Sequence, residues 1–382
     1  MSKKYSIFIT VLFCLFIFGF GIAQFVVPDR EFSEQENRYL AQMPELDFGD
    51  VSLGLKKSGN FFNGKFMEGV EDYITDQFPL RDQWIQLKAW CEKTMGKQEN
   101  NGVYLGTDKN TLFAQYTRPS YEELAKRIAY VNKLGANVDV PVYFALIPDK
   151  SFVWADRLPA NAPLVDDGSV IKDAAELVSG DVNWIDLSNA FSGDEVFYRT
   201  DHHWSTMGAH QGYNALMLAM NGRVTLLDSD ELTMVSDAFY GTTYSSAGAG
   251  WVSPDEMYTW IPEEMFNVTS YHSGKAEAGQ LYDESFLEKK DKYSMFLGGN
   301  QPLCVIENAQ SNGGKLLVIR DSYSDSLAPF LGLDYSEVHL WDLRYNRMSL
   351  KTYIAENNID QVLVLYSNSN FATDANLPLL GM

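Results

Sequence analysis

The chain has 382 residues, of which 30 are basic and 51 acidic, so its formal net charge is −21. This charge excludes a protein that binds nucleic acid electrostatically, because such binding needs clustered Lys and Arg to displace counterions from phosphates. A 46% share of hydrophobic residues excludes a disordered chain. Three cysteines and five histidines leave neither a disulfide scaffold nor a cysteine-based zinc site.

An apolar segment near the N-terminus predicts a membrane span. Residues 5–28 carry no charge, follow Lys3 and Lys4, and precede Asp29. A helix of this length crosses a hydrocarbon core about 30 Å thick, and the two lysines place the N-terminus in the cytoplasm. We expect a single-pass signal anchor in the cell membrane, with the remaining chain extracytoplasmic. The alternative is a secreted protein whose signal peptide is cut near Ala23.

The pattern beyond the span divides the chain further. Residues 1–28 are interpreted as the cytoplasmic tip and anchor, and residues 29–60 as a polar connector. Residues 61–382 are expected to form one α/β domain. Within it, residues from about 236 to 300 lack sustained helical periodicity, so we expect a small insertion of strands and loops.

Helices alternate with apolar strands along this domain. Ser120 and Glu123 make a capping box for a helix that Gly135 would end, and residues 138–150 follow as a buried strand. Two further helices are expected over 169–178 and 204–220, and three further strands over 182–187, 315–320 and 361–366. This alternation predicts an α/β layer fold with a mostly parallel sheet.

The first candidate for chemistry is the tetrad Asp-His-His-Trp at 201–204. In an extended segment, residues i and i+2 point to one side, so Asp201 and His203 would share a face. A carboxylate beside an imidazole can hold its tautomer and stabilise the imidazolium that forms when it takes a proton. The alternative is a histidine pair at the surface or a histidine hydrogen-bonded in the core.

The second candidate is Ser322, which follows the apolar strand 315–320 after Asp321. In open α/β sheets, ligands bind beyond the carboxyl ends of the strands, and N–H groups at the start of a helix can stabilise an oxyanion. The alternative is a helix N-cap, for which Ser and Asp are preferred. Together, the two segments supply a nucleophile, a base and an acid that orients the base.

A metal site is the competing interpretation of the tetrad. Asp201, His202 and His203 are possible zinc or manganese ligands, but adjacent residues rarely converge on one ion. The other histidines show no ligand spacing: His210, His272 and His339. We therefore expect no metal and no cofactor, with a metal-dependent hydrolase as the less favoured alternative.

Several segments together resemble a known family. They include FSEQENRYLAQMPEL at 32–46, GVYLGTDKNTLF at 102–113, YRTDHHWSTMGAH at 198–210, FYGTTYS at 239–245 and LLVIRDSYSDSLAPFL at 316–331. They resemble the DHHW protein family, named for the tetrad at 201–204. That family is similar to the SGNH-hydrolase-like domain of alginate O-acetylation proteins.

The resemblance implies an SGNH-hydrolase-like (flavodoxin-like) three-layer α/β/α sandwich with a Ser-His-Asp triad. Ser322 would be the nucleophile, His203 the general base and Asp201 its orienting acid. It also implies a membrane-anchored extracytoplasmic serine O-acetyltransferase or acetylesterase that acts on a cell-envelope polysaccharide. A multi-spanning membrane protein would deliver the acyl group.

Other residues are weaker candidates around this site. Relatives often carry glycine before the Asp-Ser pair, where this chain has Arg320. Candidate substrate-binding residues are Arg320, Tyr323, Arg344 and Lys150; for Arg344 and Lys150, pairing with local carboxylates is the alternative. The oxyanion would be bound by the backbone N–H of Ser322 and the side chain of Asn101.

A glycan-binding module without turnover is the alternative function. Aromatic side chains of the insertion would then stack on sugars: Trp251, Tyr258 and Trp260. The acidic exterior favours a neutral acceptor glycan. Cys91 and Cys304 either form a disulfide or remain free thiols.

Overall fold

The computed structural model describes residues 3–36, 38–46, 64–163, 166–224, 226–228, 231–272 and 274–381. The chain divides into two compact units, Met1–Lys97 with Gly248–Gly250, and Gln98–Ala247 with Trp251–Met382. Residues 47–60 of the predicted connector lie outside the described residues.

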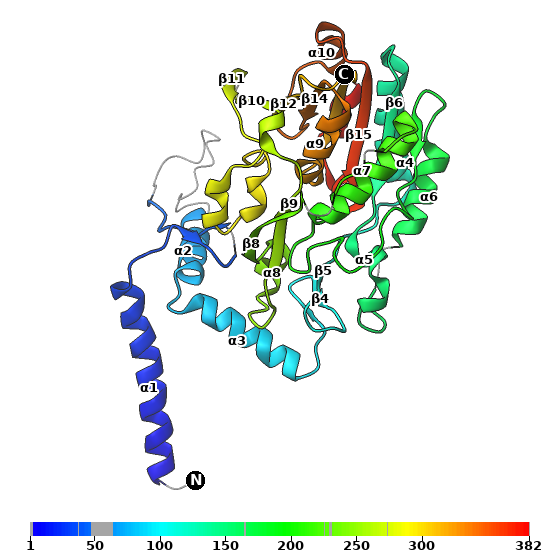
Figure 1. Ribbon diagram of the computed structural model, residues 1–382. Coiled ribbons are helices and arrows are strands. Elements are labelled where there is room, and N and C mark those ends of the chain that lie inside the picture. The colour runs from blue at the N-terminus through cyan, green and yellow to red at the C-terminus, as the bar shows by residue number, and fades with distance from the viewer. Residues whose placement is uncertain are drawn as a thin grey trace. The chain divides into compact units, whose positions relative to one another are not determined.

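The first unit contains the apolar helix that the sequence predicted. This helix, α1 (Lys3–Val26), has no buried residue and is long and apolar enough to cross a membrane. The unit continues with the antiparallel pair β1 (Phe32–Ser33) and β2 (Arg38–Tyr39), and with the helices α2 (Lys65–Asp76) and α3 (Arg81–Thr94). Figure 1 shows these elements in blue and cyan.

An eight-stranded sheet lies at the centre of the second unit (Figure 1). Its strands are β6 (Val142–Ile147), β7 (Asn183–Ile185), β10 (Asn267–His272), β11 (Lys275–Ala278), β12 (Leu303–Glu307), β13 (Lys315–Arg320), β14 (Glu337–Trp341) and β15 (Gln361–Ser367). Their order in space is β11-β10-β12-β14-β13-β15-β6-β7. The strands from β14 to β7 pair in parallel, and β12, β10 and β11 extend the sheet in antiparallel fashion. The predicted mostly parallel sheet is confirmed.

Helices cover both faces of this sheet. They are α4 (Tyr121–Asn137), α6 (Asp167–Leu177), α7 (Thr206–Asn221), α9 (Tyr323–Asp334) and α10 (Leu350–Glu356). Alternate residues of β13 enter different cores: Val318 packs in the core that includes residues of α7 and α9, and Leu317 in the core that includes residues of α4, α6 and α10. Both faces of the strand are therefore buried, which explains its continuous apolar run.

The predicted helix end at Gly135 is wrong. The capping box of Ser120 and Glu123 is confirmed, but the helix continues to Asn137. Gly135 lies inside it, and a Cβ atom there would lie 2.6 Å from Cγ2 of Val182. The glycine thus permits close packing against the segment before β7 and does not end the helix.

The region from about 236 to 300 contains strands and loops, as expected, but part of it belongs to the central sheet. The strands β8 (Thr233–Phe239) and β9 (Asp255–Thr259) form a separate antiparallel pair, with the short helix α8 (Thr242–Ala247) between them. By contrast, β10 and β11 join the central sheet through β12. An insertion over the whole range was therefore too broad a prediction.

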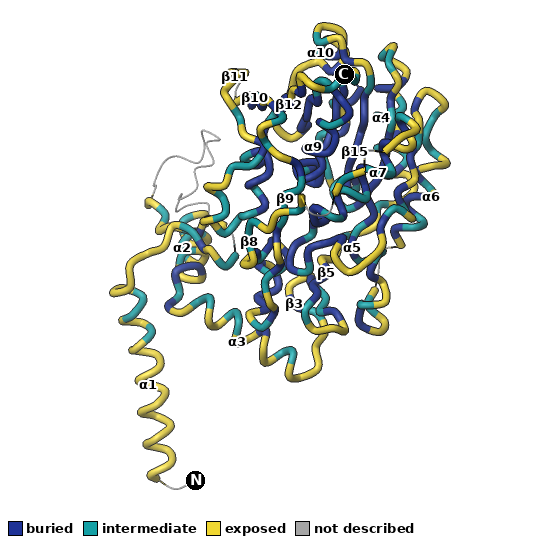
Figure 2. The backbone as a smooth tube through the Cα atoms, viewed as in Figure 1, coloured by how far each residue is buried: buried dark blue, intermediate teal, exposed yellow. Residues whose placement is uncertain are grey.

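The remaining elements are short. They are β3 (Glu99–Asn100), β4 (Val103–Leu105), β5 (Leu112–Ala114), α5 (Lys150–Val153), α11 (Asn368–Thr373) and the 3₁₀ turns at Ala155–Arg157, Glu263–Met265, Glu284–Glu288, Lys292–Met295 and Leu377–Gly381. Figure 2 shows the contrast between the buried sheet and the exposed α1. Cys304 is buried in β12, whereas Cys91 is exposed on α3, and both are free thiols.

Candidate active site

Three neighbouring parallel strands end in polar residues. Asp149 and Lys150 follow β6, Ser367 ends β15, and Asp321 and Ser322 follow β13. Because the carboxyl ends of parallel strands meet at one edge, this is where an α/β sheet binds ligands. Oδ2 of Asp321 accepts hydrogen bonds from the backbone N–H (2.8 Å) and the hydroxyl (2.9 Å) of Ser367. The turn that carries Ser322 is thereby fixed to the neighbouring strand.

Ser322, His203 and Asp201 form a continuous hydrogen-bonded series. Oγ of Ser322 lies 2.7 Å from Nε2 of His203, and Nδ1 of His203 lies 2.5 Å from Oδ1 of Asp201. The serine and the histidine are 119 positions apart in the chain. The structure therefore brings together the three residues that the sequence singled out, in the order expected of a nucleophile, a base and an acid.

The segment that carries the tetrad is bent, whereas the sequence argument assumed an extended one. Phe197 and Trp204 form an isolated antiparallel bridge, so the chain between them turns back. Within this turn, the backbone N–H of His203 donates to Oδ1 of Asp201 (3.0 Å). The expected face-sharing along a strand is wrong, because local hydrogen bonds in a turn bring Asp201 and His203 together.

Asp201 is buried and accepts further hydrogen bonds at its other oxygen. Oδ2 receives the backbone N–H (2.7 Å) and the hydroxyl (3.0 Å) of Thr242. A Cβ atom on the preceding Gly241 would lie 2.2 Å from that oxygen, so only glycine permits this approach. Burial alone would raise the pKa of Asp201, but His202 and His203 hold the pKa well below its usual value. Asp201 is thus a carboxylate at neutral pH.

Tyr293 is part of the site, although no sequence pattern marked it. Its ring stacks on the imidazole of His203, with centroids 3.8 Å apart and planes 6° apart. Its hydroxyl donates to the backbone carbonyl of Ser322 (3.1 Å) and lies 3.1 Å from Oγ of Ser326. One buried side chain therefore contacts both His203 and Ser322.

Trp204 and Tyr323 link the tetrad to the start of α9. Nε1 of Trp204 donates to the carbonyl of Tyr323 (2.9 Å) and to Oγ of Ser326 (3.0 Å). The hydroxyl of Tyr323 donates in return to the carbonyl of His202 (2.5 Å). Tyr323 is fully buried, so the structure makes it a connecting residue, and its predicted contact with substrate is not available to it.

Lys150 is also buried, and its ammonium group is hydrogen-bonded to the backbone. Its Nζ donates to three backbone carbonyls, of Tyr198 (3.0 Å), Arg199 (3.2 Å) and Asp201 (2.6 Å). An ammonium group has three N–H donors, so all of them are engaged by the loop that carries the tetrad. Burial lowers the pKa of Lys150 to about 8. Glycan binding by Lys150 is therefore a prediction that this geometry argues against.

Arg320 is buried as well, with 1% of its surface exposed. Its Nη1 lies 2.8 Å from Oδ1 of Asp325, in the first turn of α9. Burial raises the pKa of Asp325 to about 7, against the opposing effect of Arg320. The guanidinium of Arg320 is thus paired inside the protein, which argues against the predicted contact with substrate.

Arg344 lines a cavity next to the nucleophile. This cavity of about 290 Å³ is also lined by Asp321, Tyr366 and Asn370. The guanidinium of Arg344 pairs with Asp342 at 2.6 Å and is 38% exposed. Of the four predicted binding residues, Arg344 therefore has both a structural ion pair and access to a cavity.

The oxyanion donors stay predictions. Ser322 directly precedes α9. The N–H groups of the next three residues are engaged, because that of Tyr323 donates to Oδ1 of Asp321 (3.1 Å) and those of Ser324 and Asp325 donate to the carbonyls of Asp321 and Ser322. Asn101 is exposed, and its amide donates to the carbonyl of Ser246 in α8 (3.1 Å). Its backbone has a φ of 50°, in the left-handed region that asparagine tolerates in turns. A structural role in this turn accounts for Asn101.

The distances between the side chains of the tetrad also bear on its interpretation as a metal site. Ligand atoms of Asp201, His202 and His203 lie within 4.8 Å of one another. However, tetrahedral zinc with bonds of about 2.0–2.1 Å needs ligand atoms about 3.3 Å apart, and Oδ1 of Asp201 lies 2.5 Å from Nδ1 of His203. That pair of atoms fits a shared proton better than a shared ion.

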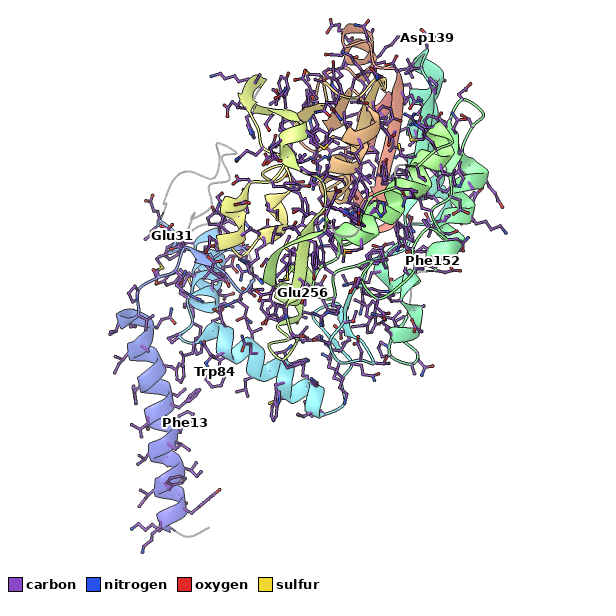
Figure 3. The ribbon with its side chains drawn as sticks, viewed as in Figure 1. Phe13, Glu31, Trp84, Asp139, Phe152 and Glu256 are labelled. Carbon is purple, nitrogen blue, oxygen red and sulfur yellow. The ribbon has the colours of Figure 1, made fainter. Side chains whose placement is uncertain are left out.

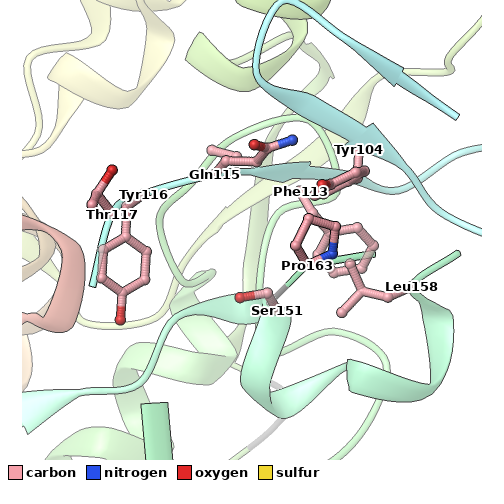
Figure 4. A pocket seen from close by; sticks show the side chains of 9 residues that line it. Tyr104, Phe113, Gln115, Tyr116, Thr117, Ser151, Leu158 and Pro163 are labelled. Atoms are coloured by element: carbon pink, nitrogen blue, oxygen red, sulfur yellow. The ribbon is translucent and has the colours of Figure 1, made fainter. Parts of the chain in front are cut away.

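A second cavity of about 290 Å³ is lined by residues of β5 and the segment after it, together with Ser151, Leu158 and Pro163. Figure 4 shows the hydroxyl of Ser151 and the ring of Tyr116 towards one end, and Phe113 and Leu158 towards the other. The ring of Phe113 lies 5.8 Å from Nζ of Lys150, which holds the tetrad loop. Aromatic faces beside hydroxyl groups suit a sugar ring. The sequence analysis did not identify this cavity, because its lining comes from separate segments.

Residues 176–341 match the family model described as "DHHW protein". The resemblance to the DHHW protein family is confirmed. The matched DHHW segment includes all three residues of the hydrogen-bonded series: Asp201, His203 and Ser322.

Known proteins similar to this chain include "Probable alginate O-acetylase AlgJ" of Pseudomonas putida, 22% identical over 240 residues. The alignment covers 60% of this chain and 62% of that relative, so the chain spans less than two thirds of the relative's length. A DHHW family protein from Eubacterium siraeum has a similar structure (TM-score 0.61, 22% identity, covering 74% of this chain and 95% of that one). Bacillus cereus PatB1 with a sulfonyl adduct is also similar (TM-score 0.59, 22% identity, 71% and 97%). These structures share the fold.

Proposed function

We propose that this chain is a membrane-anchored, extracytoplasmic serine O-acetyltransferase or acetylesterase of the SGNH-hydrolase type that modifies a cell-envelope polysaccharide. The observation that carries the proposal is the series in which Oγ of Ser322 lies 2.7 Å from His203, which lies 2.5 Å from Asp201. The DHHW match and the name of the alginate O-acetylase relative support the reaction class.

In the first half-reaction, Oγ of Ser322 attacks the carbonyl carbon of an acetyl donor, and its proton passes to Nε2 of His203. Asp201 stabilises the resulting imidazolium through its hydrogen bond to Nδ1. The backbone N–H of Ser322 would stabilise the oxyanion. When the tetrahedral intermediate collapses, the bond to the donor's leaving oxygen breaks, and that oxygen takes the proton from His203.

In the second half-reaction, a sugar hydroxyl attacks the acetyl group on Ser322. His203 removes the hydroxyl proton and returns it to Oγ, which leaves the sugar acetylated and the enzyme regenerated. Water in place of the sugar gives acetate, so one site serves both activities. We propose that the acetyl donor is presented by a multi-spanning membrane protein.

The acceptor would bind in the two cavities described above. The cavity at Phe113 and Tyr116 offers ring faces for a sugar, and Arg344 lines the cavity beside Asp321. Because Arg344 is already paired with Asp342 and the chain has a net charge of −21, a neutral acceptor is favoured over an anionic one.

Hydrolysis of p-nitrophenyl acetate by the full chain in detergent tests the proposal. Ser322→Ala and His203→Ala are each expected to lower kcat/KM by about 10³-fold or more. Ser324→Ala is the matched control, because Ser324 is buried two residues further along and its hydroxyl has no hydrogen-bond partner among the described residues. The wild type, incubated with donor and quenched in acid, should gain the mass of one acetyl group that Ser322→Ala lacks.

Three other outcomes would replace the proposal. Unchanged hydrolysis in both variants would show that the series is not catalytic. Loss of activity with a chelator, restored by Zn²⁺ or Mn²⁺, would favour the metal-dependent hydrolase. Polysaccharide binding without any turnover would favour the glycan-binding module.

A further inference from the structure

The helix α3 carries an apolar stripe on its exposed face. Leu80, Trp84, Leu87, Cys91 and Met95 follow one another at intervals of four, three, four and four residues. With 3.6 residues per turn, the three that lie inside the helix, Trp84, Leu87 and Cys91, fall within a sector of about 60°. Leu80 and Met95 cap its two ends. All five are exposed, from 37% for Trp84 to 77% for Met95. We call this set the α3 stripe.

The opposite side of α3 is the buried one. Ala89 is its buried residue, and it lies about half a turn away from Cys91. Charged residues lie at the sides of the stripe, among them Lys88 and Glu92, which form an ion pair at 3.3 Å. A helix of a soluble protein turns its apolar face inwards, whereas α3 presents a continuous apolar face outwards. Such a face indicates a binding surface.

The α3 stripe is continuous with the apolar surface of α1. The ring of Phe20 lies 5.8 Å from that of Trp84 and stacks on Phe78 at 5.4 Å, and Phe16 lies 6.4 Å from Trp84. Figure 3 labels Trp84 on α3 and Phe13 on α1. Phe20 precedes the end of α1 at Val26 by six residues, or about 9 Å. If α1 spans a bilayer, Trp84 lies at the depth of its outer leaflet.

We propose that α3 lies in the outer-leaflet interface of the bilayer that α1 crosses, with the α3 stripe immersed among the lipids. Tryptophan is enriched at this depth because its ring is apolar and its N–H is polar. Flanking cations such as Lys88 would reach the phosphates of the headgroups. The inference rests on the membrane anchoring in the proposed function and is independent of the catalytic series.

A second contact with the bilayer has a mechanical consequence for the first unit. A single helix leaves the unit free to rotate about the span and to tilt away from the surface. Two elements in one bilayer, α1 and α3, fix the unit's orientation. The lipids, with no protein partner, would then cover the stripe.

The native cysteines allow a direct test in the full chain. Cys91 lies on the α3 stripe, Cys14 lies in α1, and Cys304 is buried. Cys14→Ser protein would be labelled at Cys91 with a maleimide of the NBD fluorophore and reconstituted into phosphatidylcholine–phosphatidylglycerol vesicles. The expected result is a blue-shifted emission that spin-labelled lipids quench several-fold more strongly than aqueous iodide.

Two controls use the same label. With Cys14→Ser, Cys91→Ser and Lys126→Cys, the label sits on an exposed position of α4 in the other unit, and iodide should quench it more strongly than the lipids. With Cys91→Ser alone, the label at Cys14 reports whether α1 is in the bilayer.

The outcomes separate the two claims. Lipid quenching at both Cys14 and Cys91 supports the inference. Lipid quenching at Cys14 but iodide quenching at Cys91 overturns it, leaves the anchor intact and assigns the stripe to a protein partner. Iodide quenching at Cys14 overturns the membrane anchor and the inference together, while hydrolysis of p-nitrophenyl acetate still reports on the catalytic series.

Discussion

Two buried aspartates, Asp201 and Asp325, precede and follow the candidate nucleophile in the chain. Their surroundings differ. Asp201 accepts four hydrogen bonds, two from His203 and two from Thr242. Asp325 has an arginine cation, Arg320, at 2.8 Å. The pKa of Asp201 lies well below its usual value, whereas burial raises the pKa of Asp325 to about 7.

The comparison indicates that an adjacent cation alone does not hold the pKa of a buried carboxylate at its usual value. Both side chains are removed from water, which favours their neutral forms. At Asp201, donors aimed at both oxygens, together with the two histidines, outweigh this effect. At Asp325, the single ion pair does not. The acid of a catalytic series needs the first environment, because it must remain charged while the base gains a proton.

Activity gives the largest expected difference between the two aspartates. Asp201→Asn should lower kcat/KM for p-nitrophenyl acetate by about 10³- to 10⁴-fold, because the amide can no longer stabilise the imidazolium of His203. Asp325→Asn, of the same size, should lower it by less than about 10-fold. Equal losses in the two variants would contradict the distinction.

Tyr293 connects the two regions, because it touches His203 on one side and the residues at the start of α9 on the other. Tyr293→Ala should lower kcat by about 10- to 100-fold with little change in KM, since the imidazole loses the ring that holds it. Tyr293→Phe keeps the ring and loses only the hydroxyl, so it should recover most of the activity. If Tyr293→Phe were as impaired as Tyr293→Ala, the stacking would not be the positioning contact.

The smallest expected effect is on the free energy of unfolding. Its dependence on pH has opposite signs for Asp325 and Asp201. Asp325 has a folded pKa of about 7 against an ordinary value of 3.8, so the free energy of unfolding should fall as pH rises from about 4 to 7. Asp201 has a lowered folded pKa, so its contribution is present above about pH 4 and is lost as pH falls below it.

Melting temperatures measured against pH would separate these slopes. Asp325→Asn should flatten the fall between about pH 4 and 7, and Asp201→Asn should flatten the loss below about pH 4, each by a few degrees. If Tm rose from pH 4 to 7 by the same amount in the wild type and in Asp325→Asn, the pKa assigned to Asp325 would be contradicted.

The sequence identified the elements whose patterns are local. The strand Lys315–Arg320 has its predicted bounds, because its apolar run reflects burial on both faces. Asp201, His203 and Ser322 were found by residue type and by their places next to regular elements. Tyr293 and Thr242 were missed, because their roles depend only on contacts with distant positions.

The substrate contacts predicted for three of the binding residues stay predictions, and the burial of these residues argues against them. Charged and phenolic side chains are usually exposed, so Lys150, Arg320 and Tyr323 were assigned to substrate. The structure buries all three and pairs them with backbone carbonyls or a carboxylate. Burial of a polar group is decided by partners that only the folded chain provides.

The site is assembled from segments that are far apart in the chain, namely the loop at 201–203, the turn at Tyr293 and the turn at Ser322. Contacts of such long range form late, because the loops between them must close first. In an unfolded chain, Ser322 is an ordinary alcohol, since no imidazole lies near it. The unfolded chain is therefore expected to be unreactive towards acyl donors. The proposed esterase activity would appear only with the final tertiary contacts, so the rate at which it appears during refolding would report on their formation.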